Sequence, residues 1–229
     1  PAMLDRAASD PRRYAQRAIG TAALAIALQA LAVGAATAGA QIEEPLADAV
    51  RTALSAAVQD DAPPRPAFES IDDRLAYLRW LGAMSERLKR RKAEHTTRVE
   101  FLEALWYESR RAGLEPELVL GLVQVESAFR KYAVSKAGAR GYMQVMPFWA
   151  RLIGSGDPAR LFHMQANLRF GCVILRHYLE LERGDLFMAL GRYNGSRGRH
   201  EYPNAVLAAR RAWLPAPQAE SAGAAAARH

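Results

Sequence analysis

The stretch VQVESAFRKYAVSKAGARGYMQVMP, residues 123–147, places a carboxylate, Glu126, directly after a run of apolar residues. Val119, Leu122 and Val123 precede Glu126 by helical spacings, so they lie on the same face of a helix as Glu126. Burying an unpaired carboxylate is costly, and a raised pKa is the usual escape from that cost. Glu126 is therefore either an exposed residue of the last helical turn or an acid that stays protonated and can donate its proton.

The remainder of this stretch reads as a loop over 128–146, with glycines at positions 138 and 141. Ser135 and Gln144 supply neutral polar groups, and glycine allows the backbone to approach a ligand closely. Met143 and Met146 flank Gln144. This combination suits the hydroxyl and acetamido groups of a sugar; the alternative is a glycine turn packed over core methionines.

Helical periodicity and the lack of alternating strand patterns predict an all-α fold. Proline, glycine and capping residues set the expected ends of the helices. We expect a short helix from Pro147 to a stop at Gly154, and further helices over 41–59, 71–92, 97–112, 114–127, 163–183, 185–193 and 203–213.

The helix expected over 71–92 carries one apolar stripe, which we expect to face the core: Ile71, Leu75, Leu78, Leu81, Met84 and Leu88. The basic run Lys89-Arg90-Arg91-Lys92 closes this helix, where the macrodipole favours cations. We expect these four side chains to be solvated, with an anion-binding patch as the second interpretation.

The chain divides into four predicted parts. Basic residues followed by the uncharged, Ala-rich stretch 18–40, which ends in Ala38-Gly39-Ala40, predict a signal peptide over 1–40 with cleavage before Gln41. An uncleaved membrane anchor is the alternative. We expect a helical extension over 41–95, containing a Pro-rich linker at 60–68, then one catalytic domain over 96–214 and a disordered tail over 215–229.

Charge and cysteine content restrict the class of protein. The formal net charge of +7 favours an anionic partner such as cell wall, membrane surface or nucleic acid, and a basic solvated surface with no partner is the alternative. The basic run lacks interleaved aromatic residues, which argues against a nucleic-acid binder. The only cysteine, Cys172, lies on a helical apolar stripe and is expected to be a small buried residue. No metal or cofactor motif occurs, so we predict no cofactor and no metal site.

A glycosidase usually needs two carboxylates, yet Glu126 has no obvious partner in the sequence. The next acids along the chain are Asp157, which resembles a helix cap, then Glu180, Glu182 and Asp185. A mechanism with one carboxylate would need help from the substrate, as is known for sugars that carry an N-acetyl group.

Three short blocks resemble those of the family 1 lytic transglycosylases, whose soluble-lytic-transglycosylase domain is related to goose-type lysozyme. The blocks are Glu126-Ser127, Gly141-Tyr142-Met143-Gln144 and Tyr193-Asn194, in the family's order, and the resemblance covers about 97–213. Two residues depart from the family pattern: Tyr142 replaces a leucine, and Arg192 stands where the family often has alanine.

The resemblance implies a lysozyme-like fold with Glu126 as the single catalytic acid. It further implies a peptidoglycan lytic transglycosylase that cleaves the β-1,4 bond between N-acetylmuramic acid and N-acetylglucosamine and leaves 1,6-anhydromuramoyl ends. Tyr193 is expected to position Glu126 or the acetamido group. The residues expected to bind substrate are Ser127, Ser135, Gln144, Met146, Tyr193 and Asn194.

The expected partner is a peptidoglycan glycan strand, and the expected location is periplasmic or otherwise outside the cytoplasmic membrane. We predict a monomer that binds no nucleic acid and associates with the membrane only if the N-terminal segment stays uncleaved. Two alternatives remain open: a lysozyme-type hydrolase on the same fold, and a non-catalytic protein that binds peptidoglycan or assists assembly.

Overall fold

The computed structural model describes residues 41–59 and 66–215. Within these ranges the regular elements are all helical, as predicted, and the only β-type pairing is a pair of isolated bridges in the 134–145 loop. The predicted signal peptide, residues 60–65 of the predicted linker and residues 216–229 of the predicted tail lie outside the described residues. No helix in the described part combines the length and the hydrophobicity that crossing a membrane requires.

The helix boundaries agree with most of the sequence predictions to within a few residues. Helix α2 is shorter than expected at its start: it begins at Asp48, and residues 41–47, which include Pro45, have no regular secondary structure. Helix α9 begins two residues early, since Pro203 is tolerated in a first helical turn. The elements are α2 (Asp48–Gln59), α3 (Ile71–Leu88), α4 (His95–Arg111), α5 (Pro116–Ser127), α6 (Pro147–Ile153), η2 (Pro158–Phe162), α7 (Met164–Leu181), α8 (Leu186–Tyr193) and α9 (Glu201–Arg211).

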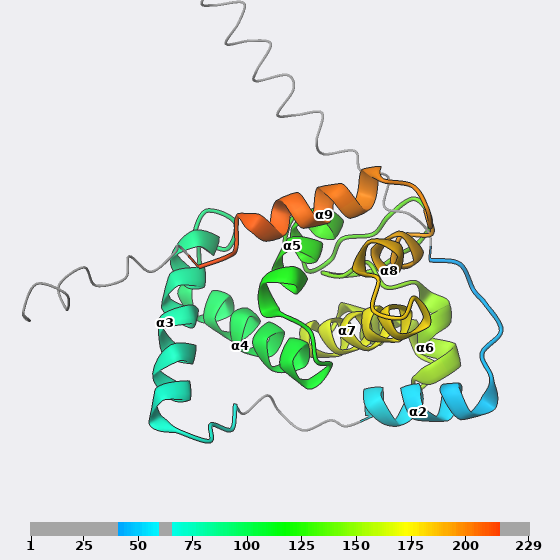
Figure 1. Ribbon diagram of the computed structural model, residues 1–229, viewed down its shortest axis with the longest axis horizontal. Helices are drawn as coiled ribbons and strands as arrows, with labels where there is room; N and C mark the ends of the chain where they lie inside the picture. Colours follow the sequence, from blue (N-terminus) through cyan, green and yellow to red (C-terminus); the bar gives the residue numbers. More distant parts are fainter. Residues whose placement is uncertain (1–40, 60–65, 216–229) are drawn as a thin grey trace, which may run out of the picture. The chain divides into compact units, whose positions relative to one another are not determined.

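Helix α5 packs against α9, and this contact carries the C-terminal end of α5 towards the start of α9 (Figure 1). The two backbones meet at Gly121, where a Cβ would lie 2.7 Å from the amide nitrogen of Arg210.

Helix α7 contacts both α4 and α8. A buried ion pair joins α4 to α7, with Arg169 Nη2 2.9 Å from Glu108 Oε1. Cys172 is buried on α7, which confirms its prediction.

The predicted core face of α3 is wrong over its first half. Ile71 is 79% exposed, and Leu75 and Leu78 are also exposed. The buried side chains of α3 are Tyr77, Met84, Ser85 and Leu88. The Tyr77 ring packs edge-on against Trp106 of α4, with centroids 4.8 Å apart, and this aromatic contact takes the place of the expected apolar contacts in the first half of α3.

The basic run after α3 is only partly solvated. Lys89, Arg90 and Arg91 are exposed as predicted, but Lys92 is half-buried. Its ammonium donates a hydrogen bond of 2.7 Å to the Tyr142 hydroxyl and lies 4.7 Å from the centroid of the same ring. A cation over an aromatic face is attracted by the ring's quadrupole, so Lys92 forms part of the packing between the extension and the loop that follows α5.

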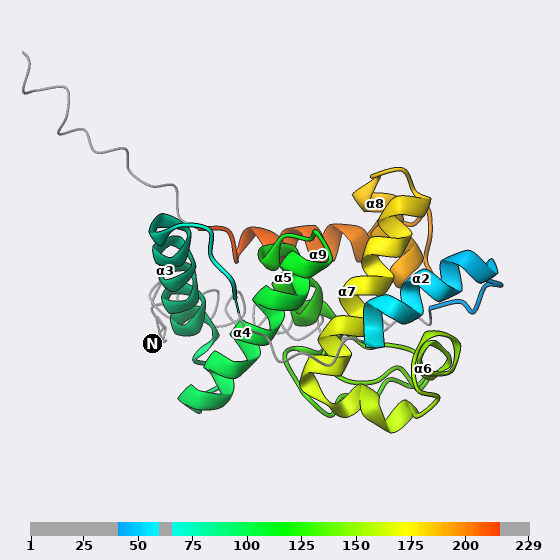
Figure 2. The ribbon, with the colours of Figure 1, turned by 90° about the horizontal axis from the view of Figure 1, so that it is seen from below.

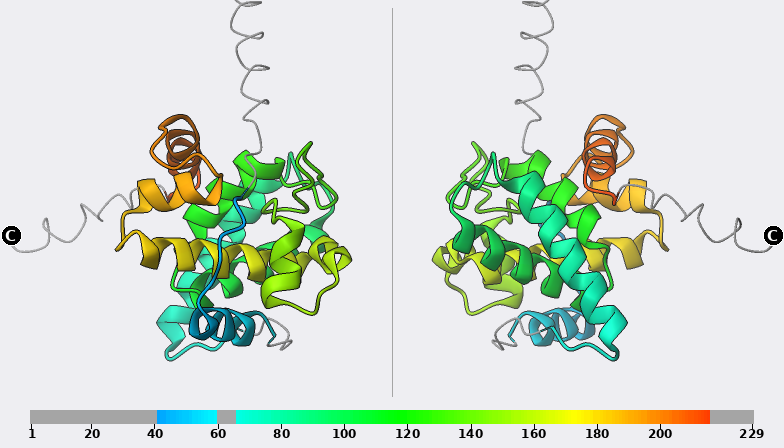
Figure 3. Two further views of the ribbon diagram at one scale, coloured as in Figure 1. Left: turned by 90° about the vertical axis from the view of Figure 1, so that its right-hand side faces the viewer. Right: turned by 90° about the vertical axis from the view of Figure 1, so that its left-hand side faces the viewer.

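Helix α2 packs against α6 and α7 (Figure 2). Residues 41–47 precede α2, and Figure 3 (left) shows them in blue as they cross the face of the domain. We call residues 41–47 the leading segment.

Candidate active site

Glu126 lies in the last turn of α5. The residues that were expected to share its helix face lie in the turns before it. Val119, Leu122 and Val123 are completely buried, and Glu126 itself is half-buried. The helix ends at Ala128, which adopts a left-handed conformation with φ of 49°. Phe129 follows, also at positive φ, and its buried ring packs against Phe101 and Trp213. Burial of this ring offsets the strain of two left-handed residues and fixes the end of the helix beside Glu126.

The surroundings of Glu126 favour the protonated form of its carboxyl. Burial raises its pKa to about 8, against a smaller lowering by the hydrogen bond from Tyr202. The Tyr202 hydroxyl donates this bond to Glu126 Oε1 over 2.5 Å. In the described part of the chain, no second carboxylate contributes to this pKa. The surroundings of Glu126 therefore favour a carboxyl that still carries a proton to donate, and no neighbouring carboxylate among the described residues contributes to this effect.

Tyr202 was not found from the sequence, although it makes the one side-chain hydrogen bond described for Glu126. It lies 76 positions further along the chain, in the first turn of α9. Only the packing of α9 on α5 brings the two together, and no motif around Tyr202 predicts that contact. Tyr193 was expected to position Glu126 or the acetamido group, whereas the hydrogen bond described for Glu126 comes from Tyr202.

Tyr193 is completely buried at the end of α8, and its hydroxyl donates a hydrogen bond of 2.8 Å to the Met143 carbonyl. Burial raises the pKa of Tyr193 well above its ordinary value, and the charge of Glu126 raises it further. Glu126 is therefore within electrostatic range of Tyr193. The structure therefore brings together one residue from each of the three sequence blocks: Glu126, Met143 and Tyr193.

Gln144 is buried in the loop and adopts a left-handed backbone conformation with φ of 48°. Its side-chain amide donates to the carbonyls of Ala133, at 3.1 Å, and Gly141, at 2.9 Å. Gly141 itself has φ of 77° and no room for a side chain, since a Cβ would lie 2.6 Å from the Leu161 carbonyl oxygen. Gln144 therefore closes the loop around the two carbonyls.

Asn167 of α7 is a second residue that sequence reasoning missed. Its Oδ1 accepts from the Met143 amide at 2.8 Å, and its Nδ2 donates to the Arg140 and Leu161 carbonyls, both at 2.8 Å. Three hydrogen bonds from one buried amide fix the backbone of the loop on α7. A polar residue on an otherwise apolar helix face was the only sequence signal for this role.

Comparison with known families supports the three-block interpretation. The model of the transglycosylase SLT domain matches residues 104–211, which include Glu126, Gln144, Tyr193 and Tyr202. Residues 104–211 thus have the sequence pattern of a transglycosylase SLT domain. The match starts within α4 and ends with α9, so α2, α3 and the leading segment lie outside it.

Two relatives illustrate how far the similarity extends. The chain is 39% identical over 84 residues to the membrane-bound lytic murein transglycosylase C of Actinobacillus pleuropneumoniae serotype 5b, covering 33% of this chain and 23% of that protein. It is 34% identical over 119 residues to the transglycosylase of Enterobacteria phage PRD1, covering 48% of this chain and 42% of that protein. The chain thus spans less than half the length of each of these relatives.

Among solved structures, the chain resembles an inactive mutant of the lytic transglycosylase Slt from Pseudomonas aeruginosa. The TM-score is 0.45 at 22% sequence identity, and the alignment covers 61% of this chain and 29% of the Slt chain.

The other residues predicted to bind substrate make mostly local contacts. The Ser127 hydroxyl is buried and donates to the Val123 carbonyl at 3.2 Å, so it serves the helix. Ser135 is half-buried, and its hydroxyl accepts from the Ala139 amide at 3.1 Å. Asn194 caps α8 and donates to the Ser196 hydroxyl at 3.0 Å. Met146 is half-buried at the start of α6.

Both departures from the family pattern make contacts with the extension. Tyr142 points into the core, where its ring packs on Phe101 and its hydroxyl accepts from Lys92. Arg192 forms an ion pair with Glu44 of the leading segment, in which Nη1 lies 2.9 and 3.0 Å from the two carboxylate oxygens. Each departure therefore provides an anchoring point for a part of the chain that lies outside the SLT match.

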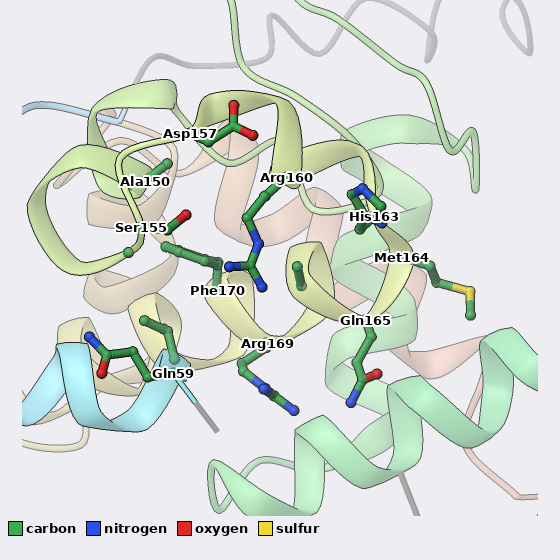
Figure 4. A pocket seen from close by; sticks show the side chains of 13 residues that line it. Gln59, Ala150, Ser155, Asp157, Arg160, His163, Met164, Gln165, Arg169 and Phe170 are labelled. Carbon is green, nitrogen blue, oxygen red and sulfur yellow. The ribbon is translucent and has the colours of Figure 1, made fainter. Parts of the chain in front are cut away.

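A cavity of about 530 Å³ lies elsewhere in the molecule, between the end of α2 and the elements α6, η2 and α7 (Figure 4). Arg160 points into it in the close-up view, and Arg169 forms part of its wall while paired with Glu108. The lining includes none of Glu126, Tyr193 and Tyr202. This cavity is thus separate from the acid of the SLT domain.

Proposed function

We propose that this protein is a peptidoglycan lytic transglycosylase. It cleaves the β-1,4 bond between N-acetylmuramic acid and N-acetylglucosamine and leaves 1,6-anhydromuramoyl ends. The observation that carries this proposal is a single half-buried carboxyl, Glu126, whose pKa is raised to about 8 within a transglycosylase SLT domain. An acid of that pKa is protonated at neutral pH, which glycosidic cleavage requires, because the leaving oxygen must gain a proton.

The reaction begins with transfer of the Glu126 proton to the glycosidic oxygen as the bond from that oxygen to C1 of the muramoyl sugar breaks. The carbonyl oxygen of the muramoyl N-acetyl group bonds to C1 and stabilises its positive charge. Glu126, now an anion that accepts a hydrogen bond from Tyr202, then removes the proton from the C6 hydroxyl. The C6 oxygen closes on C1, the carbonyl is released, and Glu126 ends the cycle protonated.

One carboxyl thus acts first as acid and then as base, which agrees with the absence of a second carboxylate from the causes of its pKa. The Tyr202 hydroxyl stabilises the intermediate anion, so the proton leaves Glu126 more easily. Within the proposal, Tyr193 and Gln144 hold the loop that faces the sugar, and Ser135, Met146 and Asn194 lie at its edges. Ser127 supports the helix that carries Glu126.

The proposed substrate sets the proposed location, since peptidoglycan lies outside the cytoplasmic membrane. A periplasmic or cell-envelope site fits the predicted signal peptide, and the relatives from Actinobacillus pleuropneumoniae are named as membrane-bound. The net charge of +7 suits an anionic wall polymer. We propose a monomer that acts on glycan strands directly.

Product analysis tests this function. Purified peptidoglycan is digested with the full chain, and the released fragments are analysed by mass spectrometry. We expect anhydro ends, each lighter by one water than a reducing end. Reducing ends would indicate a lysozyme-type hydrolase instead.

The variant Glu126→Gln keeps the size of the side chain and its ability to accept from Tyr202 but cannot donate an acidic proton. We expect the rate at which this variant releases fragments to fall by at least about a hundredfold. If the variant clears peptidoglycan as fast as the wild type, Glu126 is not the acid. If neither protein releases fragments while both bind peptidoglycan, the chain is a binding protein.

A further inference from the structure

The leading segment places one side chain inside the candidate active site. Gln41, only 3% exposed, lies against the loop that contains Gln144. Its Oε1 accepts a hydrogen bond of 3.2 Å from the backbone amide of Met146. Gln41 lies more than 60 positions before the start of the SLT match, so this contact is not part of the matched domain.

The Gln41 side chain also affects Tyr193. Its Nε2 is buried and makes no hydrogen bond of ordinary geometry within the described residues. The Gln41 side chain nevertheless lowers the pKa of Tyr193, against the larger effect of burial. A buried donor without an acceptor is unfavourable, so the burial of Gln41 between the 143–146 turn and Tyr193 calls for a physical role.

These contacts form a bridge across the turn 143–146. Tyr193 holds the Met143 carbonyl at one end of the turn, and Gln41 holds the Met146 amide at the other end. Between them, Gln144 adopts its left-handed conformation. Gln41 therefore links Tyr193, a residue within electrostatic range of Glu126, to the far end of the loop expected to contact the sugar.

An ion pair fixes the leading segment three residues further on. Both carboxylate oxygens of Glu44 accept from Arg192 Nη1, and Arg192 Nε donates to Glu182 at 2.8 Å. Arg192 directly precedes Tyr193, so the clamp acts next to the residue that Gln41 affects. Leu46 adds an apolar contact with the core.

We propose that the leading segment is a functional part of the active site. Gln41 is a positioning residue for Tyr193 and for the 143–146 turn, and the Glu44–Arg192 pair seats it there. This inference rests on the proposed transglycosylase function, because the effect of Gln41 is measured on that reaction. It explains why arginine stands before Tyr193, where the family often has alanine.

The experiment compares full-length variants on purified peptidoglycan, with turnover and KM measured separately. Gln41→Leu keeps the volume of the side chain and removes both hydrogen-bonding groups. We expect its turnover to fall at least tenfold, while KM changes less than threefold and the melting temperature by only a few degrees. Unchanged turnover in Gln41→Leu, with an active wild type, would overturn the inference and leave the proposed function standing.

Glu44→Gln tests the clamp without altering the buried residue, and Glu43→Gln is the matched control, because Glu43 is an exposed neighbour. We expect Glu44→Gln to lower turnover several-fold and Glu43→Gln to have no effect. In the double variant Gln41→Leu/Glu44→Gln, the two losses should not multiply, since Glu44 acts through Gln41. Fully multiplicative losses would contradict a seating role for Glu44.

Discussion

At the scale of single residues, the site depends on one carboxyl and the hydroxyl that holds it. The sequence pattern was sufficient to predict that Glu126 stands beside buried residues, because its spacing from Val119, Leu122 and Val123 is local. Tyr202 could not be predicted, since its contact with Glu126 arises from the packing of two helices. The pKa of Glu126, about 8, results from burial, which raises it, and from the smaller opposite effect of the Tyr202 hydrogen bond.

Tyr202→Phe tests the role of this hydroxyl through the pH dependence of activity. Wild-type activity should fall as pH rises through about 8, because Glu126 must be protonated to act as the acid. The Tyr202 hydrogen bond lowers the pKa of Glu126, so its loss should move this fall to higher pH. Turnover at neutral pH should fall about tenfold, since the carboxyl is no longer oriented.

The control for this measurement is Tyr107→Phe, because the Tyr107 hydroxyl makes no hydrogen bond within the described residues. Its pH profile should match that of the wild type. A Tyr202→Phe profile that falls at the same pH as the wild type, or at lower pH, would contradict the assigned hydrogen bond.

Glu126 also makes a prediction for stability. Its pKa is raised from 4.5 to about 8 in the folded protein, so the folded state binds this proton more tightly than the unfolded state does. The stability from the protonated form is fully present below pH 4.5 and is lost as pH rises through 8. Glu126→Gln should thus be more stable than the wild type at pH 8, on the order of 1–3 kcal/mol, with the difference disappearing near pH 4. Urea unfolding at both pH values measures this, and a difference independent of pH would refute it.

At the scale of helices, the positions of the elements were largely predictable and their faces were not. Pro116 and Gly113 mark the boundary between α4 and α5 locally, so those ends were predictable to within two residues. In the first half of helix α3 the buried side chain is Tyr77 and not a residue of the predicted apolar stripe, and periodicity alone does not determine this. The aromatic contact of Tyr77 with Trp106 decides this, and it lies between different helices.

The contact of α5 with α9 positions Tyr202 on Glu126, and Gly121 sets the distance between the two helices. A Cβ on Gly121 would lie 2.7 and 2.9 Å from backbone atoms of Arg210, which cannot move independently of α9. Gly121→Ala should therefore destabilise the fold by about 1–3 kcal/mol and separate Tyr202 from Glu126, with a loss of activity.

Gly82→Ala is the matched control, since a Cβ on Gly82 of α3 meets nothing within 4 Å. It should stabilise the fold by about 0.5–1 kcal/mol, because alanine favours a helix over glycine. Chemical denaturation of both variants tests the pair of predictions. Equal effects at the two glycines would show that the α5–α9 spacing is not limited at Gly121.

At the scale of the described molecule, the extension and the SLT domain are joined through residues of the site blocks. Lys92 binds Tyr142, Glu44 binds Arg192 and Gln41 binds the Met146 amide. Tyr142 and Arg192 were recognisable in the sequence as departures from the family, but no local pattern pairs them with residues about 50 and 150 positions earlier. The predicted domain boundary at 96 stays a prediction.

Tyr142→Phe tests whether the extension and the domain form one cooperative unit. The change keeps the ring and removes the acceptor of a half-buried ammonium, which should cost about 1–2 kcal/mol. We expect a single calorimetric transition at a lower temperature. Tyr132→Phe, at an exposed tyrosine, should leave the transition unchanged. A separate early transition, with the main one unmoved, would contradict cooperative unfolding.

The central claim is that Glu126 alone supplies and removes the protons while the C6 oxygen of the sugar, and not water, bonds to C1. The most direct test is to digest purified peptidoglycan with the full chain in water labelled with heavy oxygen and to weigh the products. The account predicts anhydromuramoyl ends that contain no heavy oxygen, and no such products from Glu126→Gln. Products that carry one heavy oxygen at the new end would contradict it, because water would then have attacked C1.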